Sequence, residues 1–139
     1  MTQATTLKFS QFLIQLGNGA VPEVFASPCG LNSRGFSRTA ATNDTNVPDC
    51  DNPDAPSWLD RDVVSLAAAL SGSGVVADED YDVWNTWWES GVSKNIKVTL
   101  GTRVWLGAAI LTKLNVTGSR GKRVDLDVSI DSDGPLVLQ

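Results

Sequence analysis

The chain has 139 residues, of which 42% are hydrophobic and 19% are charged, and its formal net charge is −5. A chain of this size and composition can bury a core as one domain without metals or disulfides, and wholesale disorder is excluded. The negative charge argues against sequence-independent binding of nucleic acid, which depends on Lys and Arg neutralising phosphates, although weak repulsion suits a duplex that slides past.

The first predicted strand covers residues 7–16, LKFSQFLIQL. Its apolar side chains fall on both parities, which suits a strand that is at least partly covered on both faces. The GNG sequence at 17–19 supplies the positive-φ residues of a tight hairpin turn, and residues 21–26 are expected to return beside the first strand. Residues 1–17 hold one lysine and an interrupted apolar run, so we expect neither a signal peptide nor a membrane span there.

A long polar stretch follows at residues 34–58. It is rich in Asn, Thr, Asp and Pro and ends in DCDNPDAPSW at 49–58, so we expect an irregular excursion. A structureless stretch of this length is uncommon in a compact domain and usually signals function or disorder. The sequence therefore predicts one domain, 1–139, that carries a projecting arm at about 34–58.

Residues 61–76, RDVVSLAAALSGSGVV, have a composition that fits a helix or a strand. The SGSG sequence at 71–74 would break a helix but is tolerated in a strand as a bend or bulge. This segment is therefore predicted to be a strand.

One helix is predicted between Asp78, a good N-cap residue, and Gly91, which stops it. Acidic residues in the first turn favour this start, because they complement the helix dipole. Tyr81, Trp84 and Trp88 fall at i, i+3 and i+7, so one aromatic face is expected to pack on a sheet.

The rest of the chain predicts antiparallel strands at 96–100, 104–116 and 124–130, with a turn at 118–121. In the last of these, apolar residues alternate with polar ones without a fault, which indicates one buried and one solvated face. The predicted fold is therefore mainly β: an antiparallel β-sandwich or barrel with one flanking α-helix and a long extended loop or arm.

The residues for catalysis and metal binding are scarce. The chain has no histidine, which removes the commonest general base and metal ligand, and no set of paired carboxylates stands out. Cys29 and Cys50 are too few for a closed zinc site. They are either buried free thiols or joined by a disulfide, which would form later in oxidising surroundings. We expect no catalytic residue, cofactor or metal.

Residues 35–91 together resemble the tail tube proteins of tailed bacteriophages. The resemblance lies in the order of the segments: a polar strand enters an Asn/Thr/Pro/Asp loop, a Trp-led strand ends in SGSG, and an acid-capped helix carries tryptophans. It covers under half of the chain, and the length and the β-rich remainder agree with it.

The resemblance implies six copies that close into a ring and rings that stack into a hollow tube. DNA would pass through the lumen without specific binding, and further partners would be other tail proteins, which can include a sheath and a tape-measure protein. Such a protein is structural, without enzymatic activity, cofactor or membrane partner. It would be located in the virion tail after assembly in the host cytoplasm.

On this interpretation the excursion is an intersubunit arm, and its prolines lower the cost of ordering it on docking. Asp125 and Asp127, on the solvated face of the last strand, are candidates for an acidic lumen. Cys29 and Cys50 flank the arm and could be joined within or between subunits. The expected arm residues are Thr42, Asp44, Pro48, Asp49, Asp51, Pro53, Pro56 and Trp58.

The alternative is a monomeric or dimeric β-sandwich module that binds glycans, because exposed tryptophans form stacking platforms. Core packing explains the helix tryptophans better, except that Trp87 points away from the stripe of Trp84 and Trp88 and could meet a neighbouring subunit. A small carboxylate-dependent hydrolase is a third hypothesis. It would need a cleft with a perturbed acid, which the sequence does not indicate.

Overall fold

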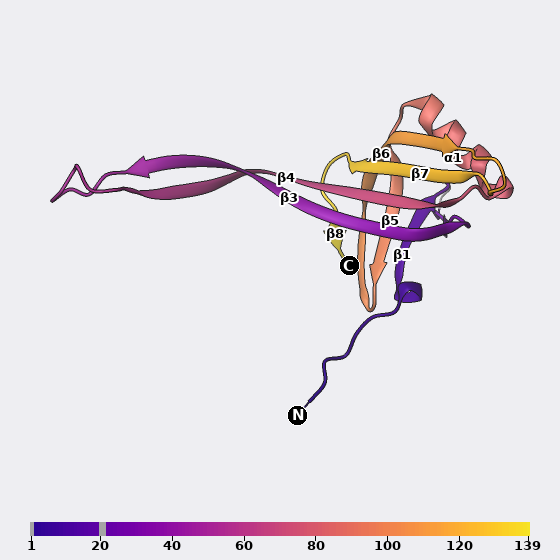
Figure 1. Cartoon of the computed structure of the whole chain (residues 1–139), viewed down its shortest axis with the longest axis horizontal. Coiled ribbons are helices and arrows are strands. Elements are labelled where there is room, and N and C mark those ends of the chain that lie inside the picture. The colour runs from indigo at the N-terminus through magenta and orange to yellow at the C-terminus, as the bar shows by residue number, and fades with distance from the viewer. Residues whose placement is uncertain (1, 20–21) are drawn as a thin grey trace. The chain divides into compact units, whose positions relative to one another are not determined.

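The computed structural model of the chain describes residues 2–19 and 22–139. The chain divides into two compact units: unit 1 is Met1–Ser37 with Ala68–Gln139, and unit 2 is Arg38–Ala67. The strands form one antiparallel sheet in the order β2-β1-β5-β6-β7-β4-β3, with β8 paired to β6 (Figure 1). The elements are η1 (Phe9–Gln11), β1 (Phe12–Gly17), β2 (Phe25–Ala26), β3 (Leu31–Val47), β4 (Trp58–Val75), α1 (Asp78–Ser90), β5 (Lys94–Leu100), β6 (Arg103–Thr117), β7 (Asp125–Ser132) and β8 (Val137–Leu138).

The predicted mainly β, antiparallel fold with a single flanking helix is confirmed for the described residues. The sandwich or barrel is not confirmed, because the strands make a single sheet whose order does not close on itself. The strands predicted at 96–100, 104–116 and 124–130 are β5, β6 and β7. In β7 the alternation buries Leu126, Val128 and Ile130.

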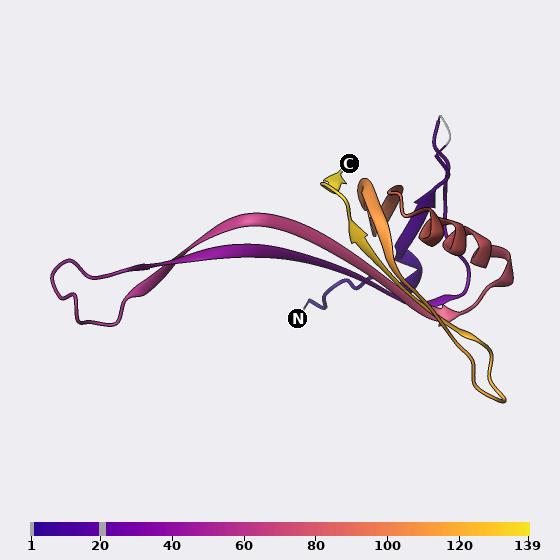
Figure 2. The same ribbon diagram turned by 90° about the horizontal axis from the view of Figure 1, so that it is seen from above.

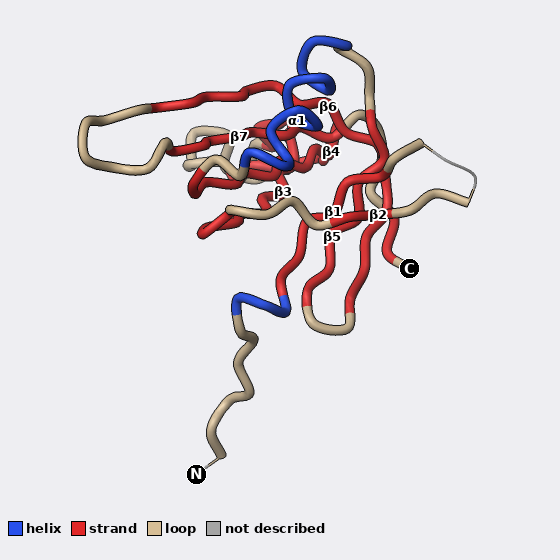
Figure 3. The backbone as a smooth tube through the Cα atoms, turned by 90° about the vertical axis from the view of Figure 1, so that its right-hand side faces the viewer, coloured by secondary structure: helices blue, strands red, loops and turns tan. Residues whose placement is uncertain are grey.

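The hydrophobic core lies in unit 1, where α1 packs on the sheet (Figure 3). Trp84 and Trp87 of α1 stack with ring centroids 6.2 Å apart and pack with the buried face of the strands. None of the clustered core residues belongs to unit 2. The core residues are Ile14, Leu16, Leu31, Leu70, Trp84, Trp87, Ile96, Val98, Trp105, Ala109, Leu111, Leu126, Val128 and Ile130.

The aromatic face of α1 differs from the prediction. Trp87, expected to point away, is 3% exposed, whereas Trp88 is 52% exposed. The Trp87 indole Nε1 donates a hydrogen bond to the Val92 carbonyl at 3.0 Å, which satisfies its polar group on burial. The buried face therefore follows a spacing of three residues, with Tyr81 half-buried at its start.

The bounds of α1 agree with the prediction at its end and differ by one residue at its start. Gly91 is the C-cap, in the left-handed region at φ 66°, as expected for a glycine that stops a helix. Asp78 is the first helical residue rather than the N-cap, which is Ala77 and makes no side-chain cap. The acidic first turn thus stabilises this end through the helix dipole alone.

The first strand begins at Phe12, later than predicted, because residues 9–11 form a 3-10 turn. The Arg34 guanidinium holds this turn against the sheet: it lies 4.2 Å from the Phe9 ring centroid and donates to the Phe12 carbonyl at 2.6 Å. The Gln11 side chain accepts from the Lys8 amide at 2.7 Å. The contacts of the distant Arg34 with this turn therefore override the local β pattern.

The predicted hairpin after β1 forms, but not with a tight turn. β1 and β2 pair through Leu16 with Ala26 and Gly17 with Phe25, so residues 18–24 make the connection. Gly19 has the expected positive φ, at 77°. Val21, the expected start of the returning strand, lies outside the described residues.

The expected irregular excursion at 34–58 is mostly β-structure. β3 runs through Val47, β4 begins at Trp58, and only residues 48–57 lie outside strands. The polar β3 sequence carries no hydrophobic alternation because none of its residues from Ser37 onward packs in a core. Its backbone is satisfied instead by pairing with β4.

The predicted strand at 61–76 is confirmed as β4, but SGSG does not form a bulge, since β4 pairs with β7 from Ala69 to Val75 without a register shift. The glycines serve a close approach instead. A Cβ on Gly74 would overlap the Gly30 carbonyl oxygen and lie 2.7 Å from the Asn32 amide nitrogen and 2.9 Å from Leu31 Cα. Only glycine lets the two backbones pack this closely.

We predict that Gly74→Ala lowers the free energy of unfolding by about 1–3 kcal/mol, because backbone atoms must move to accommodate the added methyl group. Gly118→Ala is the matched control, since a Cβ there meets no atom within 4 Å. It should change stability by no more than about 0.5 kcal/mol. Urea unfolding followed by tryptophan fluorescence measures both. Equal effects in the two variants would contradict the close-approach explanation.

Candidate subunit-interaction surface

Unit 2 consists of the distal parts of β3 and β4 and the connecting loop of residues 48–57 (Figure 2). None of its residues is buried, and only Ala55 is half-buried. A two-stranded hairpin has no interior of its own and is marginal in water. Unit 2 therefore contributes surface rather than core to the described chain.

This exposed hairpin carries large apolar side chains. Trp58 is 87% exposed and Leu66 is 80% exposed. Side chains alternate between the two faces of a strand, so Val64 and Leu66 lie on one face of β4 and Leu59 and Val63 lie on the other. Both faces of β4 therefore carry apolar side chains. Large exposed apolar side chains gathered on one strand make it a candidate interaction site. The residues are Val47, Trp58, Leu59, Val63, Val64 and Leu66.

Few side-chain contacts hold the hairpin together. Asp44 forms an ion pair with Arg61 at 3.3 Å, with both side chains largely in solvent, and Asn46 accepts from the Ser57 hydroxyl at 3.5 Å. Exposed ion pairs contribute little, about 0–1 kcal/mol. The strand pairing and any bound partner must therefore supply most of the order in unit 2.

The residues predicted for the arm all lie in unit 2, and all are exposed. Thr42 and Asp44 are in β3, Trp58 begins β4, and the remaining five are in the 48–57 loop. In this loop the Asp49 carboxylate accepts from the Asp51 amide at 2.9 Å. The structure thus places these residues in one hairpin; their contact with another subunit stays a prediction.

Sequence reasoning missed the apolar residues of β4 as part of this surface. Leu59, Val63, Val64 and Leu66 occur on both parities of a predicted strand, and such a run is also typical of a strand buried on both faces. One signal for their exposure was available: they directly follow a Pro- and Asp-rich loop. No neighbouring segment of the chain there supplies apolar residues that could cover the strand.

Charge is distributed unevenly between the two units. Unit 2 holds six aspartates and two arginines, so its net charge is −4, while the remaining residues hold ten acids and nine bases and have a net charge of −1. Three of the aspartates, Asp49, Asp51 and Asp54, lie in the 48–57 loop, which has no cation. Unit 2 is therefore both apolar along β4 and acidic at its loop.

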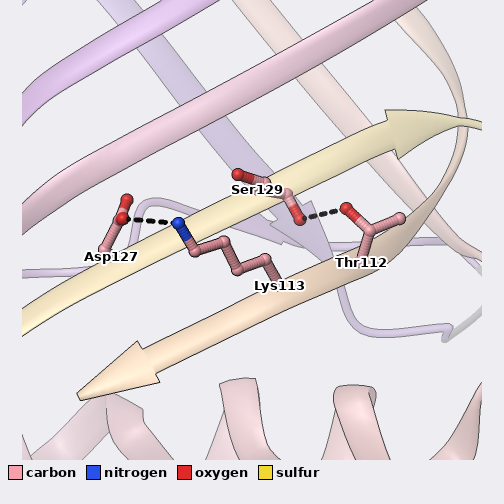
Figure 4. Close-up of polar contacts among 4 residues, drawn as sticks. All are labelled: Thr112, Lys113, Asp127 and Ser129. Atoms are coloured by element: carbon pink, nitrogen blue, oxygen red, sulfur yellow. Dashed lines mark hydrogen bonds and ion pairs between the residues drawn. The ribbon is translucent and has the colours of Figure 1, made fainter.

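The candidate lumen residues lie on β7, where Asp125 is exposed and Asp127 is half-exposed. Figure 4 shows that Asp127 pairs with Lys113 of β6 at 3.1 Å, while the Thr112 hydroxyl donates to the Ser129 carbonyl at 3.1 Å. Lys113 neutralises part of the expected acidic face. The assignment of this face to a lumen stays a prediction.

Both cysteines are free and exposed, so the alternative of buried thiols is wrong. A side-chain hydrogen bond with Asp80 and the negative charge of that carboxylate raise the pKa of the Cys29 thiol, and the same carboxylate accepts from the Cys29 amide at 2.6 Å. A raised pKa disfavours the thiolate that reacts with oxidants and disulfides. A bond of Cys29 to Cys50 stays a prediction, and non-reducing electrophoresis of assembled particles tests it.

Among residues 2–19 and 22–139 there is no cluster of three or more potential metal-binding side chains. No helix in the same residues is long and apolar enough to cross a membrane. An antiparallel sheet with an exposed apolar hairpin is typical of β-proteins that associate with other chains.

The sequence model of the phage tail tube protein family matches residues 6–138. The chain belongs to this family, and it is a structural component of a phage-type tail tube. No curated protein sequence matches the chain at a significant level.

Solved structures show the same fold at low sequence identity. A chain from the tail of an empty gene transfer agent particle, refined with C6 symmetry, has a TM-score of 0.80 at 20% identity, with 96% of this chain and 99% of that chain covered. The SPP1 tail tube protein has a TM-score of 0.65 at 8% identity, with 96% of this chain and 79% of that chain covered. A chain of the sheath-tube complex of the PVC extracellular contractile injection system has a TM-score of 0.61 at 12% identity. The match covers 96% of this chain and 91% of that chain.

Proposed function

We propose that six copies of the chain close into a ring and that rings stack into the hollow tube of a phage-type tail, the conduit for the genome. The observation that carries this proposal is unit 2, which exposes six large apolar side chains and buries none of its residues. Family membership and the sixfold symmetry of the similar gene transfer agent tail support it. Cyclic closure with a second, head-to-tail contact gives a stacked tube.

Unit 2 is the intersubunit arm in this proposal. Burying one large apolar side chain contributes about 1.5–3 kcal/mol, so Trp58 and Leu66 alone would offset a substantial part of the ordering cost. Trp58 is the anchor, because tryptophan is enriched among residues that dominate binding energy at interfaces. The prolines of the 48–57 loop restrict the free arm and reduce what docking must order.

The lumen is acidic in this proposal, with Asp125 and Asp127 on its wall, so that a densely charged duplex is repelled rather than bound during passage. An electrostatic map of the assembled tube tests this, and a net positive channel would refute it. The protein acts without catalysis or cofactor. Assembly takes place in the host cytoplasm with other tail proteins, which can include a tape-measure protein and a sheath.

Sedimentation velocity and negative-stain microscopy of the purified full chain test the assembly. The proposal predicts sixfold rings or tubes whose length grows with protein concentration. A chain that stays a small globular species at high concentration, also with a tail-tip initiator added, would overturn the proposal. Such globules would favour the glycan-binding alternative, for which the exposed Trp58 and Trp88 indoles are the available platforms.

A further inference from the structure

The turn between β6 and β7 concentrates positive charge in a chain that is negative overall. Residues 118–124 hold Arg120, Lys122 and Arg123 and no acid, and no other stretch of this length in the sequence holds three cations. All three side chains are exposed. The turn is well formed, since the Lys122 amide donates to the Ser119 carbonyl at 3.1 Å and Gly121 takes the left-handed conformation at φ 83°.

These cations have no ion-pair partner among residues 2–19 and 22–139. The other cations of unit 1 are more dispersed and several are engaged: Lys113 pairs with Asp127, and Arg34 holds the start of β1. The β6–β7 turn is therefore a compact, unneutralised basic surface. Arginine in such a position favours bidentate binding of carboxylates.

The matching acidic surface is the loop of unit 2. Residues 48–57 carry three aspartates and no base, against three cations and no acid in residues 118–124. None of the three aspartates forms an ion pair in the described part of the chain. The acids in the first turn of α1 fit less well as a partner, because the helix N-terminus already stabilises them and Asp80 accepts from the Cys29 amide.

We propose that the 48–57 loop of one subunit docks on the 118–124 turn of a second copy, so that Asp51 and Asp54 meet Arg120 and Arg123 across the subunit contact. This inference rests on the proposed tube and specifies which surface receives the arm. The apolar side chains of β4 supply most of the affinity, and the charged loops set the register and speed the encounter. Assembly should accordingly weaken as ionic strength rises.

A charge-swap experiment on the purified full chain tests the contact. Two double variants each place like charges together at the contact: Asp51→Lys/Asp54→Lys and Arg120→Glu/Arg123→Glu. Each should raise the protein concentration needed for tubes by about tenfold or more. The variant with all four substitutions restores opposite charges and should return to within about threefold of the parent chain. Turbidity and negative stain measure these concentrations.

The matched control combines Arg120→Glu/Arg123→Glu with Asp60→Lys/Asp62→Lys, which reverses exposed acids of the same unit outside the loop. This control should not restore assembly. Rescue by it, or unchanged assembly in both double variants, would overturn the proposed contact while leaving the tube intact. If the parent chain itself forms no tubes, the proposed function fails instead. Normal assembly of Arg120→Glu/Arg123→Glu with altered DNA ejection would assign the turn to nucleic acid and overturn the proposal.

Discussion

Deleting residues 38–67 and joining Ser37 to Ala68 through an Asn-Gly turn should leave a folded domain that no longer forms tubes. The deletion removes no member of the hydrophobic core, and the buried ends of β3 and β4 stay in unit 1. Asn-Gly favours the two-residue turn that connects antiparallel strands. The exposed apolar side chains of unit 2 leave with it, so the subunit contact loses its main source of affinity.

Circular dichroism and thermal unfolding report whether the deletion variant folds, and sedimentation velocity reports assembly. A smaller deletion of residues 42–56 should also leave a folded domain and abolish tubes, because β4 loses its β3 partner in this part of the hairpin, which then no longer holds its apolar side chains in place. Leu66→Ser in the full chain should impair assembly strongly, whereas Val137→Ser, an exposed apolar site in unit 1, serves as the control. Outright unfolding of both deletion variants would show that unit 2 is needed for the core and would contradict its role as an arm.

Trp84→Ala should lower the free energy of unfolding by about 3–5 kcal/mol, the range for removing a buried aromatic side chain from a core. Trp84 is 1% exposed and stacks on Trp87, so its loss leaves a cavity between α1 and the sheet. Because small domains are stable by only about 5–15 kcal/mol, this variant should be close to unfolding. The midpoint of urea unfolding measures the change.

Trp88→Ala is the matched control for this prediction, since Trp88 lies one turn along the same helix and is 52% exposed. In the isolated subunit, Trp88→Ala should lower the free energy of unfolding by much less than Trp84→Ala does. If the two variants lose the same stability, the orientation of α1 on the sheet is different from the one described. A loss of assembly in Trp88→Ala without a loss of stability would place α1 at a subunit contact.

The fold was predictable where burial and local pattern coincide. In β7 a strict alternation of apolar and polar residues corresponds to one buried face, and Gly91 ends α1 because its left-handed conformation needs no Cβ. β3 was not predictable, since its Ser, Thr and Asn side chains face solvent and leave no pattern. Such a strand forms because its backbone pairs with a neighbouring strand, and the local sequence pattern does not reveal that pairing.

The helix and the glycines show a second limit. Trp87 and Trp88 are adjacent, and the buried one, Trp87, packs in the core and donates its indole hydrogen bond to the carbonyl of Val92. Gly74 was interpreted as a bend, although its role is to admit the backbone of residues 30–32. The error at Gly74 arises from a contact between distant segments and the error at Trp87 from the way α1 packs on the sheet, and the local sequence reveals neither. The acidic and proline-rich residues expected in the arm lie in the exposed hairpin, and their contact with another subunit stays a prediction.

A cryo-electron microscopy reconstruction of the tubes formed by the full chain would show where unit 2 lies in the assembly. The proposed assembly predicts sixfold rings in which unit 2 of each subunit lies against another copy, with Trp58 and Leu66 buried at that contact. It would be contradicted by tubes in which unit 2 stays in solvent with these side chains exposed, or by a preparation that contains only monomers.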